Sequence, residues 1–357
     1  MNRMVSFQPT WVSAPGETIA DILKERNITK SVFAQEMELS EQMVGTLLQG
    51  ESEITINLAR RLEKFLGGSI EFWMLRDHNY REVATNLSSE ISKWFSDLPI
   101  SDLIKYGWIE RHSDHSNDLE IYLNFFGVRN KEQWVKKYSN IRNSVSFRTS
   151  KAFISHPASI AAWLRKGELF ADSIQCKNWN LINFQESLTE IRQLTYLKDP
   201  SRFLPKLMQI AAESGVAIAI VRTPSKCHAS GASYFLTDKK AIIQLSFRYL
   251  TDDHFWFTLF HEAGHLILHK GKGIFLEGSS ISENVEETEA NNFASEILIP
   301  KEKRPILKTL PVSSKDIIRF ATELGISPGI VVGQMQYSKI IGREQLNRLK
   351  RRYRWVD

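Results

Sequence analysis

The stretch from Phe255 to His269, FWFTLFHEAGHLILH, constrains the fold of this chain more than any other. It is apolar over four helical turns, yet His261, Glu262 and His265 stand in its middle. Residues four apart lie on one face of an α-helix, so the imidazoles of His261 and His265 can reach a single ion. Two imidazoles beside a carboxylate suit Zn²⁺. The pattern therefore predicts a zinc-binding helix.

Glu262 lies one step around this helix, beside the expected metal. That position suits a general base that takes a proton from water, rather than a ligand. Gly264 lets another segment approach the helix closely. The alternative is a buried helix whose histidines are hydrogen-bonded core residues, but polar groups in so apolar a helix cost free energy unless they have partners.

A tetrahedral zinc site with an open position needs a third protein ligand. The stretch EETEANNFASEILIP, residues 286–300, predicts a second helix that stops at Pro300. One stripe of this helix has small residues in its middle and can lie against the first: Glu287, Ala290, Asn291, Ala294 and Leu298. We expect Glu287 to be the third ligand and Asn291 to hydrogen-bond a ligating histidine. Glu286 and Glu289 compete with Glu287, unless they form a solvated first turn that suits the helix dipole.

The runs FTLFHEAGHLILH and ETEANNFASEILIP together resemble the ImmA/IrrE family of zinc metallo-endopeptidases. The likeness extends through residues 215–222, 241–246 and 326–333, roughly the last third of the chain. The resemblance implies a Zn²⁺ cofactor. It also implies a protein substrate of the repressor or antitoxin type, as in bacteria and their mobile elements.

Residues 16–80 predict five short helices, with Ser40 as the N-cap of the third, Glu41–Leu48. Two short helices joined by a tight turn form a helix-turn-helix. The runs FAQEMELSEQMVGTLLQGESEIT and SIEFW resemble XRE-type domains, most closely the HigA antitoxin branch. The resemblance implies an operator DNA partner and a homodimer.

The third helix is expected to enter the major groove of DNA. The residues expected at base edges are Ser40, Gln42, Met43 and Thr46, and those expected at phosphates are Lys30, Ser31 and Gln49. The range from Glu17 to Lys64 contains nine acidic and six basic side chains, so its net charge is negative. Phosphate neutralisation supplies most non-specific affinity, so this head should bind DNA weakly unless it dimerises. The alternative is a helical module for dimerisation or for a protein partner.

From residue 81 to 214 the periodicity predicts mostly helices. The expected helices are 87–95, 100–106, 119–126, 131–138, 159–171 and 184–197. Residues 216–221, 232–235 and 241–245 predict strands, the last two as a hairpin. Either hairpin strand is a candidate edge for substrate strand addition, or an interior strand. Residues 271–284 are expected to form a polar loop over the cleft.

Four further side chains of types that bind metals stand on either side of this motif in the sequence. Cys227 and His228 stand in a loop, as a possible latency ligand or as ordinary loop residues. For His254 and His269 we expect a supporting rather than a ligating role, because the chain lacks the glycine spacing of the HExxHxxGxxH class.

The whole chain of 357 residues predicts a multidomain, mainly α protein with a small α+β zincin-like domain. The expected domains are a helix-turn-helix head at 1–82, a helical middle region at 83–214 and a zinc peptidase domain at 215–357. Two cysteines give no disulfide framework, and no run of 18 apolar residues or signal peptide is present. We therefore expect a cytoplasmic protein with no membrane partner. The basic run 343–354 is either a nucleic-acid contact or a solvated helix face.

These patterns favour a cytoplasmic zinc endopeptidase with a DNA-binding regulatory head, active in a stress, phage or mobile-element response. The expected ligands are His261, His265 and Glu287, and Glu262 moves the proton. The alternative is a helix-turn-helix regulator or antitoxin whose zinc domain is a sensor with little or no proteolysis.

Overall fold

The computed structural model describes residues 13–110, 118–138, 156–269, 275–277 and 285–355. The chain divides into two compact units, residues 1–97 and 98–357. In the described part of the chain, no helix is long and apolar enough to cross a membrane.

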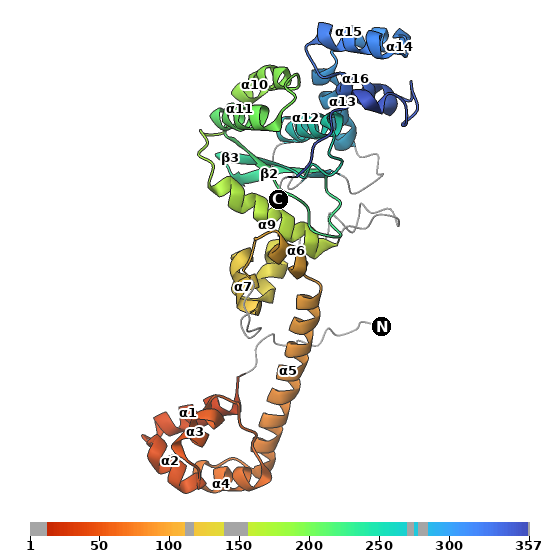
Figure 1. The fold of residues 1–357 in the computed structure, drawn as a ribbon. Helices are drawn as coiled ribbons and strands as arrows, with labels where there is room; N and C mark the ends of the chain where they lie inside the picture. The colour runs from red at the N-terminus through yellow and green to blue at the C-terminus, as the bar shows by residue number, and fades with distance from the viewer. Residues whose placement is uncertain (1–12, 111–117, 139–155, 270–274, 278–284, 356–357) are drawn as a thin grey trace, which may run out of the picture. The chain divides into compact units, whose positions relative to one another are not determined.

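The first unit contains five helices, as expected, but the fifth is not short: it has 27 residues and includes the separate helix expected over 87–95 (Figure 1). They are α1 (Pro15–Glu25), α2 (Lys30–Met37), α3 (Glu41–Leu48), α4 (Ile56–Leu66) and α5 (Ile70–Ser96). Their starts follow from side-chain caps, because the hydroxyls of Thr29, Ser40, Thr55 and Ser69 accept backbone N–H groups of the first turns. Ser40 is thus confirmed as the cap of the third helix. The chain continues in α5 through residue 82, so that expected domain limit falls inside a helix, and the division at 82 and 214 remains a prediction.

A small sheet forms the centre of the second unit, in the order β1-β3-β2-β4. Its strands are β1 (Val216–Ile220), β2 (Gly231–Thr237), β3 (Lys240–Leu245) and β4 (Phe275–Glu277). The hairpin of β2 and β3 is confirmed, and β1 lies parallel to β3. The expectation of a polar loop over 271–284 was wrong for β4, which pairs with Gly231–Ser233; its other residues lie outside the described ranges. Within the described residues β4 is therefore an edge, and β3 is an interior strand.

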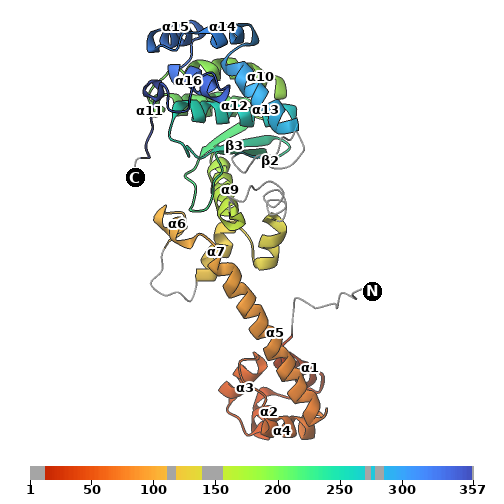
Figure 2. The same cartoon turned by 90° about the vertical axis from the view of Figure 1, so that its right-hand side faces the viewer.

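Helices cover both faces of this sheet (Figures 1 and 2). On one face lies α9 (Pro157–Asp172) and on the other α10 (Leu181–Leu194), α11 (Pro200–Glu213) and α12 (Asp252–Leu268). Alternate side chains of β3 serve the two faces: Ile243 packs in the core beneath α12, whereas the Gln244 amide donates to the Trp163 carbonyl of α9 at 2.7 Å. Both faces of the sheet are therefore buried, and α12 packs on one of them.

The expected helices between residues 98 and 197 are present, as α6 (Ile100–Lys105), α7 (Asp118–Phe126), a helical run over 131–138, α9 and α10. Aromatic residues in this region pack together, since the Phe126 ring lies 5.7 Å from Trp134 and 5.5 Å from Tyr138. Helix α11 was not anticipated. Its two prolines obscured it, although Pro200 suits the first helical turn.

Four helices follow the sheet: α13 (Val285–Leu298), α14 (Arg304–Thr309), α15 (Ser314–Leu324) and α16 (Pro328–Tyr337). The turn between α15 and α16 repeats the turn between α2 and α3. In both, a residue with left-handed backbone ends the first helix, Glu38 with φ 50° and Gly325 with φ 68°. In both, a serine caps the second helix, Ser40 and Ser327. The sequences FAQEMELS (33–40) and FATELGIS (320–327) correspond without a gap.

The second of these turns supports α12, whereas α3 after the first turn has an exposed surface. Most of α16 is buried against α12. The Ser327 hydroxyl donates to the Asp252 carboxylate at the start of α12, and a side chain at Gly329 would overlap that carboxylate. The cap of α15 is Ser313, because the Ser313 hydroxyl accepts from the Asp316 N–H at 3.1 Å.

Residues 350–353, called here the C-terminal strap, cross the start of α12. The Lys350 ammonium lies 2.6 Å from the buried Asp253 carboxylate. The Arg351 N–H donates to Asp252 at 2.9 Å, and its guanidinium donates to the carbonyls of residues 195–197 at the end of α10. The expectation of a solvated helix face over 343–354 was therefore wrong: the stretch contains one 3-10 turn, Asn347–Leu349, and two of its cations are bound within the fold.

Candidate metal centre

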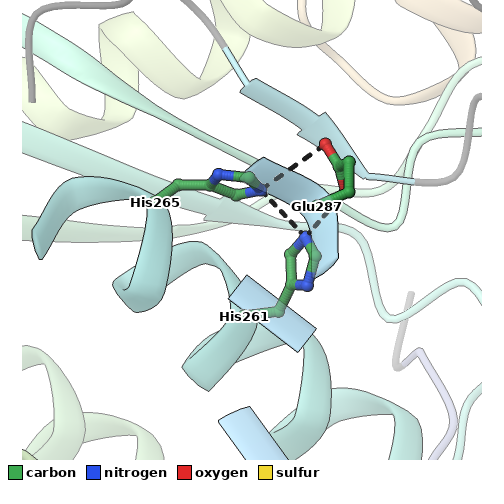
Figure 3. Close-up of side chains that lie close together, drawn as sticks. All are labelled: His261, His265 and Glu287. Carbon is green, nitrogen blue, oxygen red and sulfur yellow. Dashed lines mark hydrogen bonds and ion pairs between the residues drawn. The ribbon is translucent and has the colours of Figure 1, made fainter. Parts of the chain in front are cut away.

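Three ligand-type side chains from α12 and α13 converge on one point (Figure 3). The Nε2 atoms of His261 and His265 lie 3.0 Å apart. Carboxylate oxygens of Glu287 lie 3.3 Å from Nε2 of His261 and 3.6 Å from Nε2 of His265. Both histidines are buried, at 1% exposure each. The structure thus brings together the three residues expected to bind the metal.

The close approach of α13 follows from small residues on both helices. A Cβ at Gly264 would lie 3.3 Å from the Ala290 Cα and 3.1 Å from the Phe293 ring, so a side chain there would crowd α13. Ala290 and Ala294 are fully buried along the same stripe. Because the two backbones come this close, the Glu287 side chain reaches the histidines one helix away.

The outer nitrogen of each histidine has a specific partner. The Nδ1 atom of His261 lies 3.0 Å from Asn291 Oδ1, the contact expected for Asn291. The Nδ1 atom of His265 lies 3.1 Å from Nδ1 of His269, and Nε2 of His269 lies 2.8 Å from a carboxylate oxygen of Glu289. A carboxylate accepts, so Nε2 of His269 carries the proton, its Nδ1 accepts, and Nδ1 of His265 donates.

This hydrogen bonding turns two lone pairs toward each other. With Nδ1 of each histidine donating outward, Nε2 of His261 and of His265 both present lone pairs at 3.0 Å. The Glu287 carboxylate adds a third acceptor at the same point. Three converging acceptors repel one another unless a cation lies among them, so this cluster can hold a metal ion.

The protonation states of the cluster also suit a cation. Burial lowers the pKa of His265, and this outweighs the opposing effect of the nearby Glu287 carboxylate. Burial alone would raise the pKa of Glu287, but the nearby His261 and His265 outweigh it and hold that pKa well below the usual range. The neutral imidazole and the ionised carboxylate are the forms that bind metals.

Glu262 lies fully buried between α12 and β2. Its carboxylate accepts a hydrogen bond from the Ser233 hydroxyl of β2 at 2.5 Å. Gly231 of the same strand leaves room for it, because a Cβ there would lie 2.7 Å from a Glu262 oxygen. Strand β2 therefore fixes the position of the Glu262 carboxylate, and Glu262 follows His261 directly in the sequence.

The other side chains weighed for the site lie elsewhere. His254 is exposed and stacks on Tyr249, with ring centroids 4.2 Å apart. Cys227 is buried, which raises the pKa of its thiol to about 12, and the His228 carbonyl accepts from Arg248. Neither Cys227 nor His228 belongs to the cluster found among the described residues. The pairing of His269 with Glu289 was not anticipated, although the spacing of His265 and His269 places them on one helix face.

In the first unit, several expected DNA contacts have partners within the fold. The Ser40 hydroxyl caps α3, the Ser31 hydroxyl donates to Glu41 at 2.6 Å, and the Thr46 hydroxyl donates to the Met43 carbonyl at 3.0 Å. The remaining four expected residues are exposed: Lys30, Gln42, Met43 and Gln49.

Each of the two units contains a region that matches a known protein family. Residues 214–333 match the model described as the IrrE N-terminal-like domain of the Peptidase_M78 family, and both helices of the cluster lie inside that range. Residues 19–73 match a helix-turn-helix model. No curated protein matches the chain. The chain is therefore a fusion of an XRE-type helix-turn-helix domain with an IrrE/ImmA-like domain of the Peptidase_M78 family.

Proposed function

We propose that this chain is a zinc-dependent endopeptidase with a DNA-binding regulatory head, acting in the cytoplasm on a repressor- or antitoxin-type protein. The observation that carries the proposal is the convergence of two imidazole lone pairs and the Glu287 carboxylate. Two nitrogens and one oxygen form the ligand set of catalytic zinc sites, which keep a fourth position for water or substrate.

The choice of zinc rests on the chemistry of the donors. Imidazole suits zinc, copper, nickel and iron, whereas magnesium and calcium take oxygen ligands. The outer partners Asn291 and His269 fix the ring orientation of His261 and His265, which strengthens metal binding.

Bound zinc would polarise the scissile carbonyl and lower the pKa of a water molecule toward about 7. Glu262 accepts a proton as the water oxygen bonds to the carbonyl carbon. It then delivers that proton to the amide nitrogen, which leaves as an amine when the C–N bond breaks. Ser233 donates to the Glu262 carboxylate and holds it in place for both transfers.

The substrate backbone is proposed to pair with β4. Among the described strands β4 lies at the edge of the sheet, while β3 is interior and β2 is paired to β4 over Gly231–Ser233. An extended polypeptide can hydrogen-bond such an edge, which supports a protein substrate.

The helix-turn-helix match and the exposed surface of α3 support DNA binding by the first unit. Gln42 and Met43 are the proposed base contacts, with Lys30 and Gln49 at phosphates. Ser40, Ser31 and Thr46 are proposed to support this surface through their internal hydrogen bonds, and the unit is proposed to act as a homodimer, which doubles the phosphate contacts.

The test measures zinc and hydrolysis together. Wild type, His265→Ala, Glu287→Ala and Glu262→Gln are purified, their zinc is measured by plasma mass spectrometry, and cleavage is followed on a peptide library made from a bacterial proteome. We expect about one zinc per chain in wild type and Glu262→Gln, loss of zinc in the other two, and at least a hundred-fold slower cleavage by Glu262→Gln. Glu296→Gln, on the same helix α13 but paired with Lys301, is the matched control and should behave as wild type.

The helix-turn-helix domain also supports a second candidate, a regulator whose zinc domain senses a ligand and hydrolyses little. Operator footprinting with wild type and Glu262→Gln separates the two. Equal protection of DNA by both proteins, with no peptide cleaved by wild type, favours the regulator.

A further inference from the structure

A cavity of about 90 Å³ lies between α12, α13 and α16. Phe257, Leu298, Ile330 and Tyr337 form its apolar walls, and Asp253, His254 and Gln334 form its polar part. A single buried water needs only about 10–15 Å³ by the same measure. The cavity therefore has room for several waters or for one medium-sized side chain.

Phe257 connects this cavity to the metal centre. It stands one helical turn before His261, and the centroids of the two rings lie 6.3 Å apart. On its other side, the Phe257 ring lies 6.1 Å from the Tyr337 ring. An extended polypeptide advances about 3.3 Å per residue, so a substrate held at His261 brings a side chain to the cavity within two or three residues.

The chemistry of the walls selects an uncharged occupant. Leu298 and Ile330 are buried, whereas Tyr337 is 64% exposed and leaves the cavity accessible from solvent. The Asp253 carboxylate in the wall is already paired with Lys350 at 2.6 Å. A charged side chain entering here would lose its hydration and, among the described lining residues, gain no permanently charged partner that is free to pair with it, which costs free energy.

We infer that this cavity binds the apolar side chain, of leucine, methionine or phenylalanine size, of a substrate residue close to the bond that is cleaved. The inference rests on the proposed peptidase function. The cavity would give the peptidase site its preference for certain substrate side chains. Such side chains are buried in folded proteins. The substrate must therefore present an unfolded or loosened segment, so cleavage depends on the stability of the target as well as on its sequence.

The test uses hydroxamates as zinc-binding probes on the zinc-loaded full chain. Dipeptide hydroxamates carrying glycine, leucine, phenylalanine or aspartate are titrated by calorimetry. The proteins are wild type, Tyr337→Ala and the control Tyr196→Ala, whose ring is similarly exposed in the turn after α10. We expect leucine and phenylalanine to bind about ten-fold tighter than glycine, and aspartate no tighter. Tyr337→Ala should reduce that advantage to about three-fold or less, and Tyr196→Ala should preserve it.

Each outcome decides between the inference and the function on which it rests. Equal affinity for all four side chains, or an advantage that Tyr337→Ala leaves intact, overturns the pocket while the metal site stands. Failure of every hydroxamate, including glycine, to bind the zinc-loaded protein overturns the peptidase site and the pocket with it. A second variant, Gln334→Leu, makes the wall more apolar and should increase the preference for leucine over aspartate.

Discussion

Nδ1 of His265 lies 3.1 Å from Nδ1 of His269, and the far nitrogen of His269 lies 2.8 Å from Glu289. One of two facing imidazole nitrogens must carry a proton, and the Glu289 carboxylate determines which. The hydrogen on His265 then points away from the cluster. A carboxylate near the surface thus sets the tautomer of a fully buried ligand.

The first prediction follows from this chain of hydrogen bonds. His269→Ala removes the acceptor for Nδ1 of His265 and should weaken zinc binding about 10- to 100-fold. Glu289→Gln keeps an accepting oxygen and should weaken it much less. Affinity is measured by competition with a chromophoric chelator, with Glu296→Gln as the control. Unchanged affinity in His269→Ala would show that the ring of His265 is held by other contacts.

The second prediction concerns pH. Protons compete with zinc for the imidazole nitrogens, so affinity falls as pH falls. An ordinary histidine titrates near about 6.5. The pKa of His265 is lowered by burial, so its protonated form appears only below that pH. Zinc affinity should therefore stay nearly constant from pH 8 to about 6.5 and decline below it, measured by the same competition at each pH. A decline that is complete above pH 7 would contradict this assignment.

The third prediction concerns the ion pair between Lys350 and Asp253. The two side chains are 10% and 7% exposed, so Lys350→Met leaves a buried carboxylate without its cation. The variant should lose about 3 kcal/mol of unfolding free energy, measured for the second unit by urea denaturation. Lys339→Met, an exposed lysine nearby in sequence, is the control and should change little. Adding Asp253→Asn to Lys350→Met should restore part of the loss.

The fourth prediction concerns DNA. Gln42 is exposed on α3, whereas the Ser31 hydroxyl is bound to Glu41. Gln42→Ala should weaken specific binding by about 1–3 kcal/mol, and Ser31→Ala should weaken it less, because Ser31 supports the surface only through Glu41. The target is first selected from a randomised DNA pool and affinity is then measured at fixed salt. Retention of no DNA by wild type would instead favour a protein partner for the acidic first unit.

Helices α12 and α13 could be predicted from the sequence because the residue patterns that mark them are local. The spacing of His261 and His265 fixes one helix face, and the stripe through Glu287 and Asn291 fixes another. The caps of α2 and α3 are equally local, and both families were identified from these runs.

What the sequence did not predict depends on distant contacts. Strand β4 has three residues and exists because it pairs with Gly231–Ser233. The sequence near Lys350 offers few acidic partners and so predicts solvated cations. In the structure Lys350 pairs with Asp253, nearly a hundred residues earlier. The cavity beside Phe257 likewise needs three helices that no single window of sequence contains.

The C-terminal strap ties the metal helix to the order in which the chain is made. Ribosomes add Lys350 and Arg351 long after His261, His265 and Glu287, yet the Lys350 ammonium pairs with Asp253 and the Arg351 backbone N–H donates to Asp252 at the first turn of α12. During translation the two carboxylates of that turn lack these partners, because residues 350 and 351 have not been synthesised. The helix that carries His261 and His265 therefore gains these contacts only after both residues have been added.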